Sequence, residues 1–280
     1  MIIESHEIQL KSLNNALRRL RGACSVLDGE ELDEKLLGVM RRLLLAELLA
    51  DMWIIAIGGS QGAGKTTLIA SLYDLPRDSG GWLRSNEGRG EKMPVLILES
   101  IETEVVQGYV RRLVESGNGL TLEDVSVDIN EFQKAVCDPN SGDLLPVLKV
   151  PQRYFIRNNQ AWLLLPGYEK QDRENREWQK LMRQAMIAAG GCIIVTDETR
   201  LANQQQVEIV KDMLQKELKN CNFYIVISKT EGCRHNYERQ AELRTSAAET
   251  FNVAAEYRGS NIILTGSDDQ GYITEWMPKI

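Results

Sequence analysis

The hydrophobic positions of the chain fall into short continuous runs that are separated by longer stretches with helical spacing. Continuous apolar runs of this length are typical of buried strands, whereas apolar residues three and four apart are typical of amphipathic helices. Strands are expected at residues 53–57, 94–98, 192–197, 223–227 and 261–265. Helices are expected at residues 68–73, 101–116, 172–189, 202–219 and 236–255. The alternation predicts a three-layer α/β fold, in which helices cover both faces of a mostly parallel sheet.

The first fifty residues have a helical pattern of their own. Leucines at spacings of three and four predict helices over residues 8–27 and 31–50. The second helix is apolar over much more than the ~100° stripe of a surface helix. We therefore expect it to join a helical bundle or a partner interface, although both helices could simply cover the domain that follows. The pattern separates an N-terminal helical segment, residues 1–50, from a larger domain at residues 51–280.

Three stretches interrupt the alternation within the larger domain. Residues 77–93 are polar and glycine-rich, which predicts a flexible segment that closes over a bound ligand. Residues 117–150 carry turn signals around one helix candidate at 129–137, and we interpret them as an insertion. Residues 154–156 and 161–165 are expected to form a hairpin.

The strongest candidate for a functional site is the segment that directly follows the first predicted strand. Residues 59–66 match the pattern G-x-x-x-x-G-K-[ST], and a helical pattern comes next. Backbone N–H groups of such a loop surround phosphate oxygens, glycines allow the close approach, and the helix adds its positive end. Lys65 would bridge the β- and γ-phosphates, and the Thr66 hydroxyl would bind Mg²⁺. The alternative is a glycine-rich turn that matches by chance. The candidate residues are Gly59, Ser60, Gln61, Gly62, Ala63, Gly64, Lys65, Thr66 and Thr67.

Three further strand ends carry residues that could serve a ligand at the same edge of the sheet. Residues 165–167 are Leu-Pro-Gly, and residues 228–231 are Ser-Lys-Thr-Glu. Asp197 and Glu198 close a third apolar run. An acid at this place resembles the Walker-B pattern of P-loop ATPases, in which the aspartate binds Mg²⁺. It could equally cap the helix that follows.

Composition narrows the class of protein. The 280 residues are 43% hydrophobic and 26% charged, as in soluble globular proteins. A net charge of −7 argues against broad nucleic-acid binding, so no nucleic-acid partner is expected. The five cysteines are scattered and show no C-x-x-C spacing, which disfavours a disulfide framework and a zinc site. Membrane contact is not evident, because no run approaches ~20 apolar residues and no signal peptide is present. We expect a cytoplasmic protein.

The order of these motifs resembles the GTPase domain of the dynamin superfamily, especially its bacterial members. The resemblance covers about residues 51–270, and residues 1–50 are similar to the helix that precedes such domains and joins a stalk. It implies a P-loop NTPase fold that binds GTP and GDP, hydrolyses GTP with Mg²⁺ and self-associates through the nucleotide domain.

The resemblance also implies roles for individual residues. Gln61 would place the attacking water, and the Gly167 N–H would sense the γ-phosphate. The motif formed by residues 228–231 would read the base. Its candidate residues are Ser228, Lys229 and Glu231.

Three positions depart from the family pattern. The family has Asp where Leu164 stands, Thr where Glu91 stands and Asp where Glu231 stands. These departures predict slow basal hydrolysis and leave the choice between GTP and ATP open, because a longer carboxylate must shift to accept hydrogen bonds from guanine. Two alternatives stay open: a degenerate nucleotide-binding scaffold with little hydrolysis, and a P-loop ATPase that uses Asp197. Since the chain ends soon after its last strand, we also expect it to be a fragment of a longer protein.

Overall fold

The computed structural model describes residues 6–24, 30–76, 81–83, 91–116, 119–138, 142–167, 189–201, 223–268 and 271–274. Contacts divide the chain into two compact units, which are described separately. The first unit comprises Met1–Ile54, Gly80–Trp82 and Glu91–Leu163. The second comprises Ile55–Ser79, Leu83–Gly90 and Leu164–Ile280.

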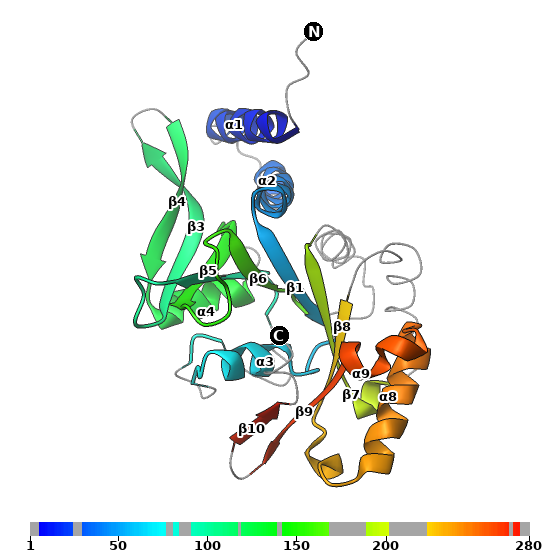
Figure 1. Ribbon diagram of the computed structural model, residues 1–280. Coiled ribbons are helices and arrows are strands. Elements are labelled where there is room, and N and C mark those ends of the chain that lie inside the picture. The colour runs from blue at the N-terminus through cyan, green and yellow to red at the C-terminus, as the bar shows by residue number, and fades with distance from the viewer. Residues whose placement is uncertain are drawn as a thin grey trace. The chain divides into compact units, whose positions relative to one another are not determined.

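The first unit combines two N-terminal helices with part of the sheet. Strand β2 is parallel to β5, and β3 is antiparallel to both β5 and β4, so that β3 and β4 form a long ribbon (Figure 1). Its elements are α1 (His6–Cys24), α2 (Glu30–Asp51), β2 (Val95–Ser100), β3 (Gln107–Ser116), β4 (Gly119–Val127), α4 (Ile129–Cys137), β5 (Leu145–Pro151) and β6 (Gln160–Leu164).

The second unit contains the parallel part of the sheet. The strand order is β10-β9-β8-β7-β1, in which β9, β8, β7 and β1 are mutually parallel and β10 is antiparallel to β9. Its strands are β1 (Trp53–Gly59, from Ile55 onwards), β7 (Gly191–Asp197), β8 (Phe223–Ser228), β9 (Ile262–Asp268) and β10 (Gly271–Thr274). Its helices are α3 (Lys65–Leu72), α6 (Glu198–Leu201), α8 (Tyr237–Phe251) and α9 (Arg258–Asn261), with short 3₁₀ turns at Glu231–Cys233 and Ala255–Tyr257.

Burial explains why these strands read as continuous apolar runs. Strands of a parallel sheet are covered on both faces and therefore need apolar residues at successive positions. Side chains of Cys192–Val195 in β7 and of Ile225–Ile227 in β8 are all buried. The predicted P-loop α/β fold with a mostly parallel sheet is confirmed. Because parallel strands share a direction, the segments that follow β1, β7 and β8 leave the sheet at one edge.

Most elements predicted from the pattern are confirmed, and two are wrong. The helix predicted over 101–116 is strand β3, which pairs with β4 on one side and β5 on the other. Cross-strand contacts decide it: Arg111 forms two hydrogen bonds with Asp124 of β4, at 2.6 and 2.9 Å. A Cβ on Gly108 would lie 2.1 Å from the Trp82 ring, so β3 also packs tightly against that side chain. Helical spacing in a short segment could not reveal these partners.

The predicted hairpin at 154–156 is also wrong, because those residues form no strand. The Glu99 carboxylate accepts hydrogen bonds from the N–H groups of Arg153, Tyr154 and Phe155 at 2.8–3.0 Å, which satisfies the backbone without a strand partner. The helices predicted at 172–189 and 202–219 and most of the glycine-rich segment at 77–93 lie outside the described residues.

The two N-terminal helices form as predicted and pack on each other. The Asn14 side chain donates to Glu47 across them at 2.5 Å. The Arg41 side chain is buried and donates from Nε and Nη2 to the Asp143 carbonyl, at 2.9 and 2.5 Å. Burial lowers the pKa of Arg41 to about 10, so the guanidinium stays charged at neutral pH. Among the helices that the structure describes, none combines the length and the apolar content needed to cross a membrane.

We predict that Arg41→Met lowers the free energy of unfolding by about 1.5–3 kcal/mol, because the buried Asp143 carbonyl loses both charge-assisted donors. Urea unfolding followed by circular dichroism measures the change. The matched control is Arg42→Met on the same helix, where the side chain is exposed, and it should stay within about 0.5 kcal/mol of wild type. Equal effects of both variants would contradict the anchoring role of Arg41.

Candidate functional site

The loop between β1 and α3 has the backbone conformation that the sequence pattern requires. Gly59, Gly62 and Gly64 have φ angles of 146°, 72° and 96°, which side chains rarely tolerate. A Cβ on Gly59 would lie 2.1 Å from the Val195 carbonyl oxygen. The first glycine thus lets β1 end directly against β7, and the later two let the chain turn into α3.

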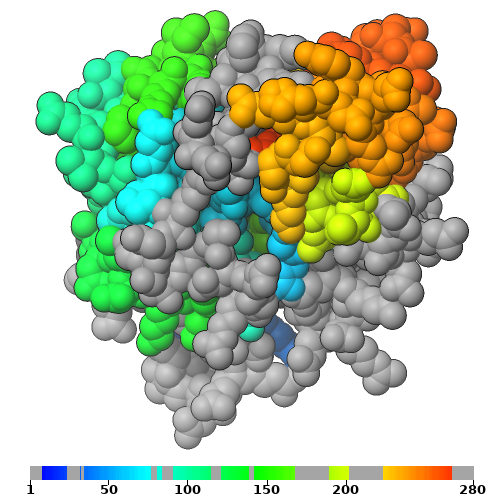
Figure 2. All heavy atoms as spheres, turned by 90° about the horizontal axis from the view of Figure 1, so that it is seen from below, coloured from blue at the N-terminus to red at the C-terminus, as the bar shows by residue number. Residues whose placement is uncertain are grey.

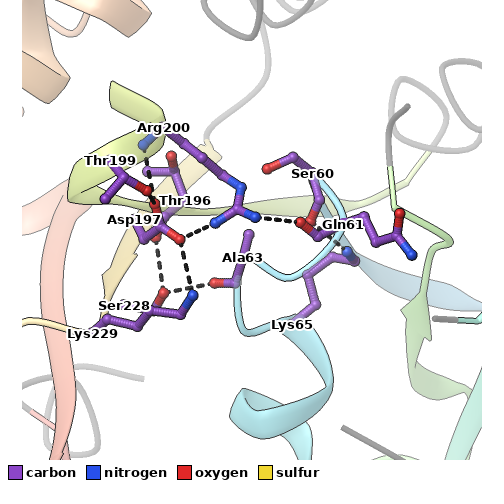
Figure 3. A network of polar contacts seen from close by, with 10 residues as sticks. All are labelled: Ser60, Gln61, Ala63, Lys65, Thr196, Asp197, Thr199, Arg200, Ser228 and Lys229. Carbon is purple, nitrogen blue, oxygen red and sulfur yellow. Dashed lines mark hydrogen bonds and ion pairs between the residues drawn. The ribbon is translucent and has the colours of Figure 1, made fainter. Parts of the chain in front are cut away.

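The start of α3 is arranged to bind an anion. Gly64 is the N-cap of α3, and no side chain caps the first turn, so the positive end of the helix lies at the end of the loop. The Lys65 side chain is almost fully buried, and its Nζ donates to the Ser60 carbonyl at 2.9 Å. The ammonium group therefore lies over the loop (Figure 3). Thr66 is buried in the same turn.

Asp197, at the end of β7, is a buried acid with a complete set of donors. Its Oδ1 accepts from the Thr199 hydroxyl at 2.7 Å and from the Arg200 N–H at 3.0 Å. Its Oδ2 pairs with Arg200 Nη1 and lies 3.3 Å from Lys229 Nζ. Burial raises the pKa of Asp197, but the hydrogen bond from Thr199 and the charge of Arg200 outweigh it and hold the pKa below its usual value.

Arg200 connects this acid to the phosphate loop, and the sequence interpretation missed it. One end of the guanidinium pairs with Asp197, and Nη2 donates to the Gln61 carbonyl at 2.6 Å (Figure 3). The available signal was local: Thr199 and Arg200 stand two and three residues after a strand-end Asp, where an acid accepts hydrogen bonds from the following turn. In the space-filling view, the α6 segment and the chain after β8 lie side by side at the surface (Figure 2).

Ser228, the last residue of β8, contacts the loop through its side chain. The Ser228 hydroxyl lies 2.6 Å from the Ala63 carbonyl and 3.1 Å from the Thr196 carbonyl, and it can donate to one of them at a time. A Cβ on Gly64 would lie 3.2 Å from this hydroxyl. Ser228 is therefore buried under the loop, while the Lys229 side chain is 57% exposed.

Gly167 also lies close to the loop. A Cβ there would lie 2.6 Å from Gln61 Cα and 2.7 Å from Gln61 N, so only glycine fits at this place. The Leu165 N–H donates to the Ile57 carbonyl at 3.0 Å, which fixes this segment along β1. Leu164, which stands where the family has Asp, is fully buried.

Glu231 is placed against β9. A Cβ on Gly266 would lie 2.6 Å from Glu231 N and 2.7 Å from its Oε2, so the glycine makes room for the longer carboxylate. Thr230 fixes the turn, because its N–H and hydroxyl donate to the Thr265 carbonyl at 3.1 and 2.9 Å. The structure thus brings the loop together with Gly167 and Ser228. Lys229 contacts Asp197, Glu231 stands one turn further along, and Glu91 belongs to the first unit.

The residues around the loop limit which side chains could bind a metal ion. Among the described residues, no group of three His, Cys, Asp or Glu side chains could hold a metal ion. Asp197 uses both oxygens for four donors, about all the lone pairs that a carboxylate has. This donor set disfavours the ATPase alternative, in which Asp197 binds Mg²⁺. Thr66 remains, and Mg²⁺ at nucleotide sites needs only one or two protein ligands besides phosphates and water.

Comparison with solved structures shows that this is the fold of a bacterial dynamin GTPase domain. The chain superposes on a bacterial dynamin, described as an oligomerised pair that senses and tethers membranes, with a TM-score of 0.53 and 14% identity over 95% of this chain. Weaker matches are Era from Aquifex aeolicus bound to GDP and AlF₄⁻ (TM-score 0.40, 14% identity, 76% of this chain and 50% of that one) and LeoA, a bacterial dynamin GTPase from ETEC (0.35, 16%, 92% and 37%).

The chain spans 41% of the length of that first bacterial dynamin. No protein-family model matches the sequence, and comparison with curated proteins finds no relative. At these identities the likeness establishes the fold, and the activity is a separate question.

We predict that Gly59→Ala unfolds or loosens the loop, because the added Cβ meets a backbone carbonyl that cannot rotate away. The expected loss of stability is about 2–3 kcal/mol, as for overpacked core sites, together with loss of nucleotide binding. Thermal unfolding and calorimetric titration measure the two effects. The control is Gly232→Ala, where an added Cβ meets nothing within 4 Å. A Gly59→Ala protein as stable as this control would show that the loop is not held against β7 as described.

Proposed function

We propose that the chain is a Mg²⁺-dependent GTP-binding and GTP-hydrolysing domain of the dynamin type. The observation that carries the proposal is the loop at residues 59–66, in which positive-φ glycines, an uncapped helix start and the Lys65 ammonium converge. This combination binds phosphate in P-loop proteins. Residues 51–280 would form the nucleotide domain and residues 1–50 the helical segment that precedes it.

Hydrolysis would proceed by in-line attack of water on the γ-phosphate, with positioning and charge neutralisation as the sources of catalysis. Lys65 would neutralise phosphate charge and Gln61 would orient the water. The Gly167 N–H would contact the γ-phosphate, which its close approach to Gln61 supports. The Thr66 hydroxyl would hold Mg²⁺, which supplies charge stabilisation at the phosphates.

Base selection would lie in the segment after β8. Ser228 would support the loop rather than the base, because its hydroxyl contacts the Ala63 carbonyl. Lys229 and Glu231 would contact the nucleoside, and the glutamate carboxylate would accept hydrogen bonds from the guanine edge. The space that Gly266 leaves for Glu231 supports this assignment.

A second candidate function is a nucleotide-binding scaffold with little hydrolysis. The burial of Leu164 favours it, since the position that offers a carboxylate in the family is occupied by a core side chain. On either reading we expect a cytoplasmic protein, because the five cysteines are scattered along the chain and lack the spacing of a disulfide framework.

We predict phosphate release from GTP but not from ATP, at a slow basal rate. Lys65→Ala should abolish binding of both nucleotides without unfolding the chain, because the lysine charge acts on phosphate. Phosphate-release assays with each nucleotide, and calorimetric titration of the variant, measure these outcomes. Wild-type affinity in Lys65→Ala would overturn the phosphate-site assignment. Tight GTP binding without phosphate release would favour the scaffold, and equal turnover of ATP would remove the guanine assignment.

We further predict that hydrolysis per molecule rises with protein concentration, because the dynamin-type proposal includes self-association through the nucleotide domain. The bacterial dynamin with the similar fold is described as oligomerised, which supports this. Specific activity over a wide dilution series, with light scattering in the presence and absence of GDP and aluminium fluoride, measures it. Constant specific activity together with a monomer in both states would contradict the prediction.

A further inference from the structure

The guanidinium group of Arg200 lies between a buried acid and the backbone of the phosphate loop. Its Nη1 pairs with Asp197 Oδ2, and its Nη2 donates to the Gln61 carbonyl at 2.6 Å (Figure 3). A Cβ added to Gly62 would lie 3.0 Å from the same Nη2. Arg200 therefore packs directly against two consecutive residues of the loop, and each of its two terminal nitrogens contacts a different partner.

A second segment holds Gln61 at other atoms. Gly167 approaches the Gln61 N and Cα so closely that a Cβ there would lie 2.7 and 2.6 Å from them. Gln61 thus has its amide side confined by Gly167 and its carbonyl fixed by Arg200. A residue held at both peptide groups has little freedom to change its φ and ψ angles, so its side chain starts from a defined position.

Arg200 itself is held in place by the acid. Asp197 is oriented by the Thr199 hydroxyl at 2.7 Å and by Lys229 Nζ at 3.3 Å. A planar guanidinium that pairs with an oriented carboxylate has one preferred direction. The contacts therefore run from β7 through Asp197 and Arg200 to the carbonyl of Gln61.

We propose that Arg200 is a positioning residue, which fixes the Gln61 backbone so that the Gln61 side chain can hold the attacking water in line with the γ-phosphate. This inference rests on the proposed GTP hydrolysis. Asp197 acts through Arg200 by setting the direction of its guanidinium, and it acts on the loop rather than on a metal ion. Displacement of a catalytic group by about 1 Å can slow a reaction on the order of 100-fold, so a contact that prevents such a displacement can change the rate by a similar factor.

The test compares Arg200→Met and Arg200→Lys with wild type at saturating GTP. We expect single-turnover hydrolysis to fall about 10–100-fold in both variants while affinity for GTP and GDP changes less than about threefold. Lysine keeps the charge, but its single nitrogen cannot occupy the two positions held by Nη1 and Nη2, so we expect no rescue. The matched control is Arg239→Met, which removes an exposed arginine paired with Glu198, the first residue of the same short helix α6. It should hydrolyse GTP like wild type.

A double variant separates positioning from a general structural effect. In a Gln61→Ala background, Arg200→Met should slow hydrolysis by less than about threefold further, because the group that Arg200 positions is already gone. Additive losses would overturn the proposal. So would an equal loss of GTP and GDP affinity with an unchanged rate, since Arg200 would then serve nucleotide binding instead. Full activity of Arg200→Lys would also overturn the proposal, because the positive charge of residue 200 alone would then be sufficient.

Hydrogen exchange tests the contact between Arg200 and the loop without relying on GTP hydrolysis. In nucleotide-free protein, Arg200→Lys should speed amide exchange of a peptide covering residues 60–64, whereas Arg239→Met should not. If wild type releases no phosphate from GTP, the proposed function fails, and the contact between Arg200 and the loop is still judged by this exchange. Unchanged exchange in Arg200→Lys would overturn the positioning role by itself.

Discussion

The close approach of two backbones at the edge of the sheet is the constraint on which the site depends. The Val195 carbonyl of β7 stands 2.1 Å from the place where a side chain at residue 59 would begin. Glycine at this position lets β1 run parallel to β7 up to its last residue, with Gly59 paired to Val195. The loop then begins beside the last residues of β7. Arg200 follows the end of β7 and Ser228 ends β8, so both lie where their side chains contact the loop.

A buried charge at such an edge must be balanced locally, and the balance here also supports the loop. An isolated carboxylate in the interior is costly unless donors surround it. Asp197 receives a hydroxyl, a backbone N–H and two cationic groups, and one of those cations continues to the Gln61 carbonyl. The pKa of Asp197 lies below its usual value, so the acid is ionised at neutral pH. The arginine that balances the charge of Asp197 therefore also holds the backbone of Gln61.

The sequence predicts the parts of this arrangement that local chemistry encodes. The glycines and Lys65 can be predicted because a phosphate loop requires those residue types at fixed spacing. The parallel strands can be predicted because burial on two faces requires apolar runs. The contact between Arg200 and Gln61 joins residues 139 apart in the chain, and no spacing rule encodes it. Strand β3 was wrongly predicted as a helix for the same reason, since it is a strand by virtue of its pairing with β4, where Arg111 contacts Asp124. The fit of Gly266 against Glu231 likewise exists only once β8 and β9 are aligned.

The loss of a carboxylate at position 164 changes which residues a hydrolysis mechanism could use. In the proposed function, phosphate binding would depend on backbone N–H groups and Lys65, none of which needs that carboxylate. Catalysis depends on how well a water is held, because the protein contributes little covalent chemistry to phosphoryl transfer. With Leu164 in the core, the proposed hydrolysis would have no carboxylate at this position to help hold the water. Gln61 is a loop residue whose backbone is fixed by neighbours on two sides. A site of this kind would keep its affinity for nucleotide under changes that abolish turnover, and its rate would respond to whatever tightens or loosens the contacts of one residue.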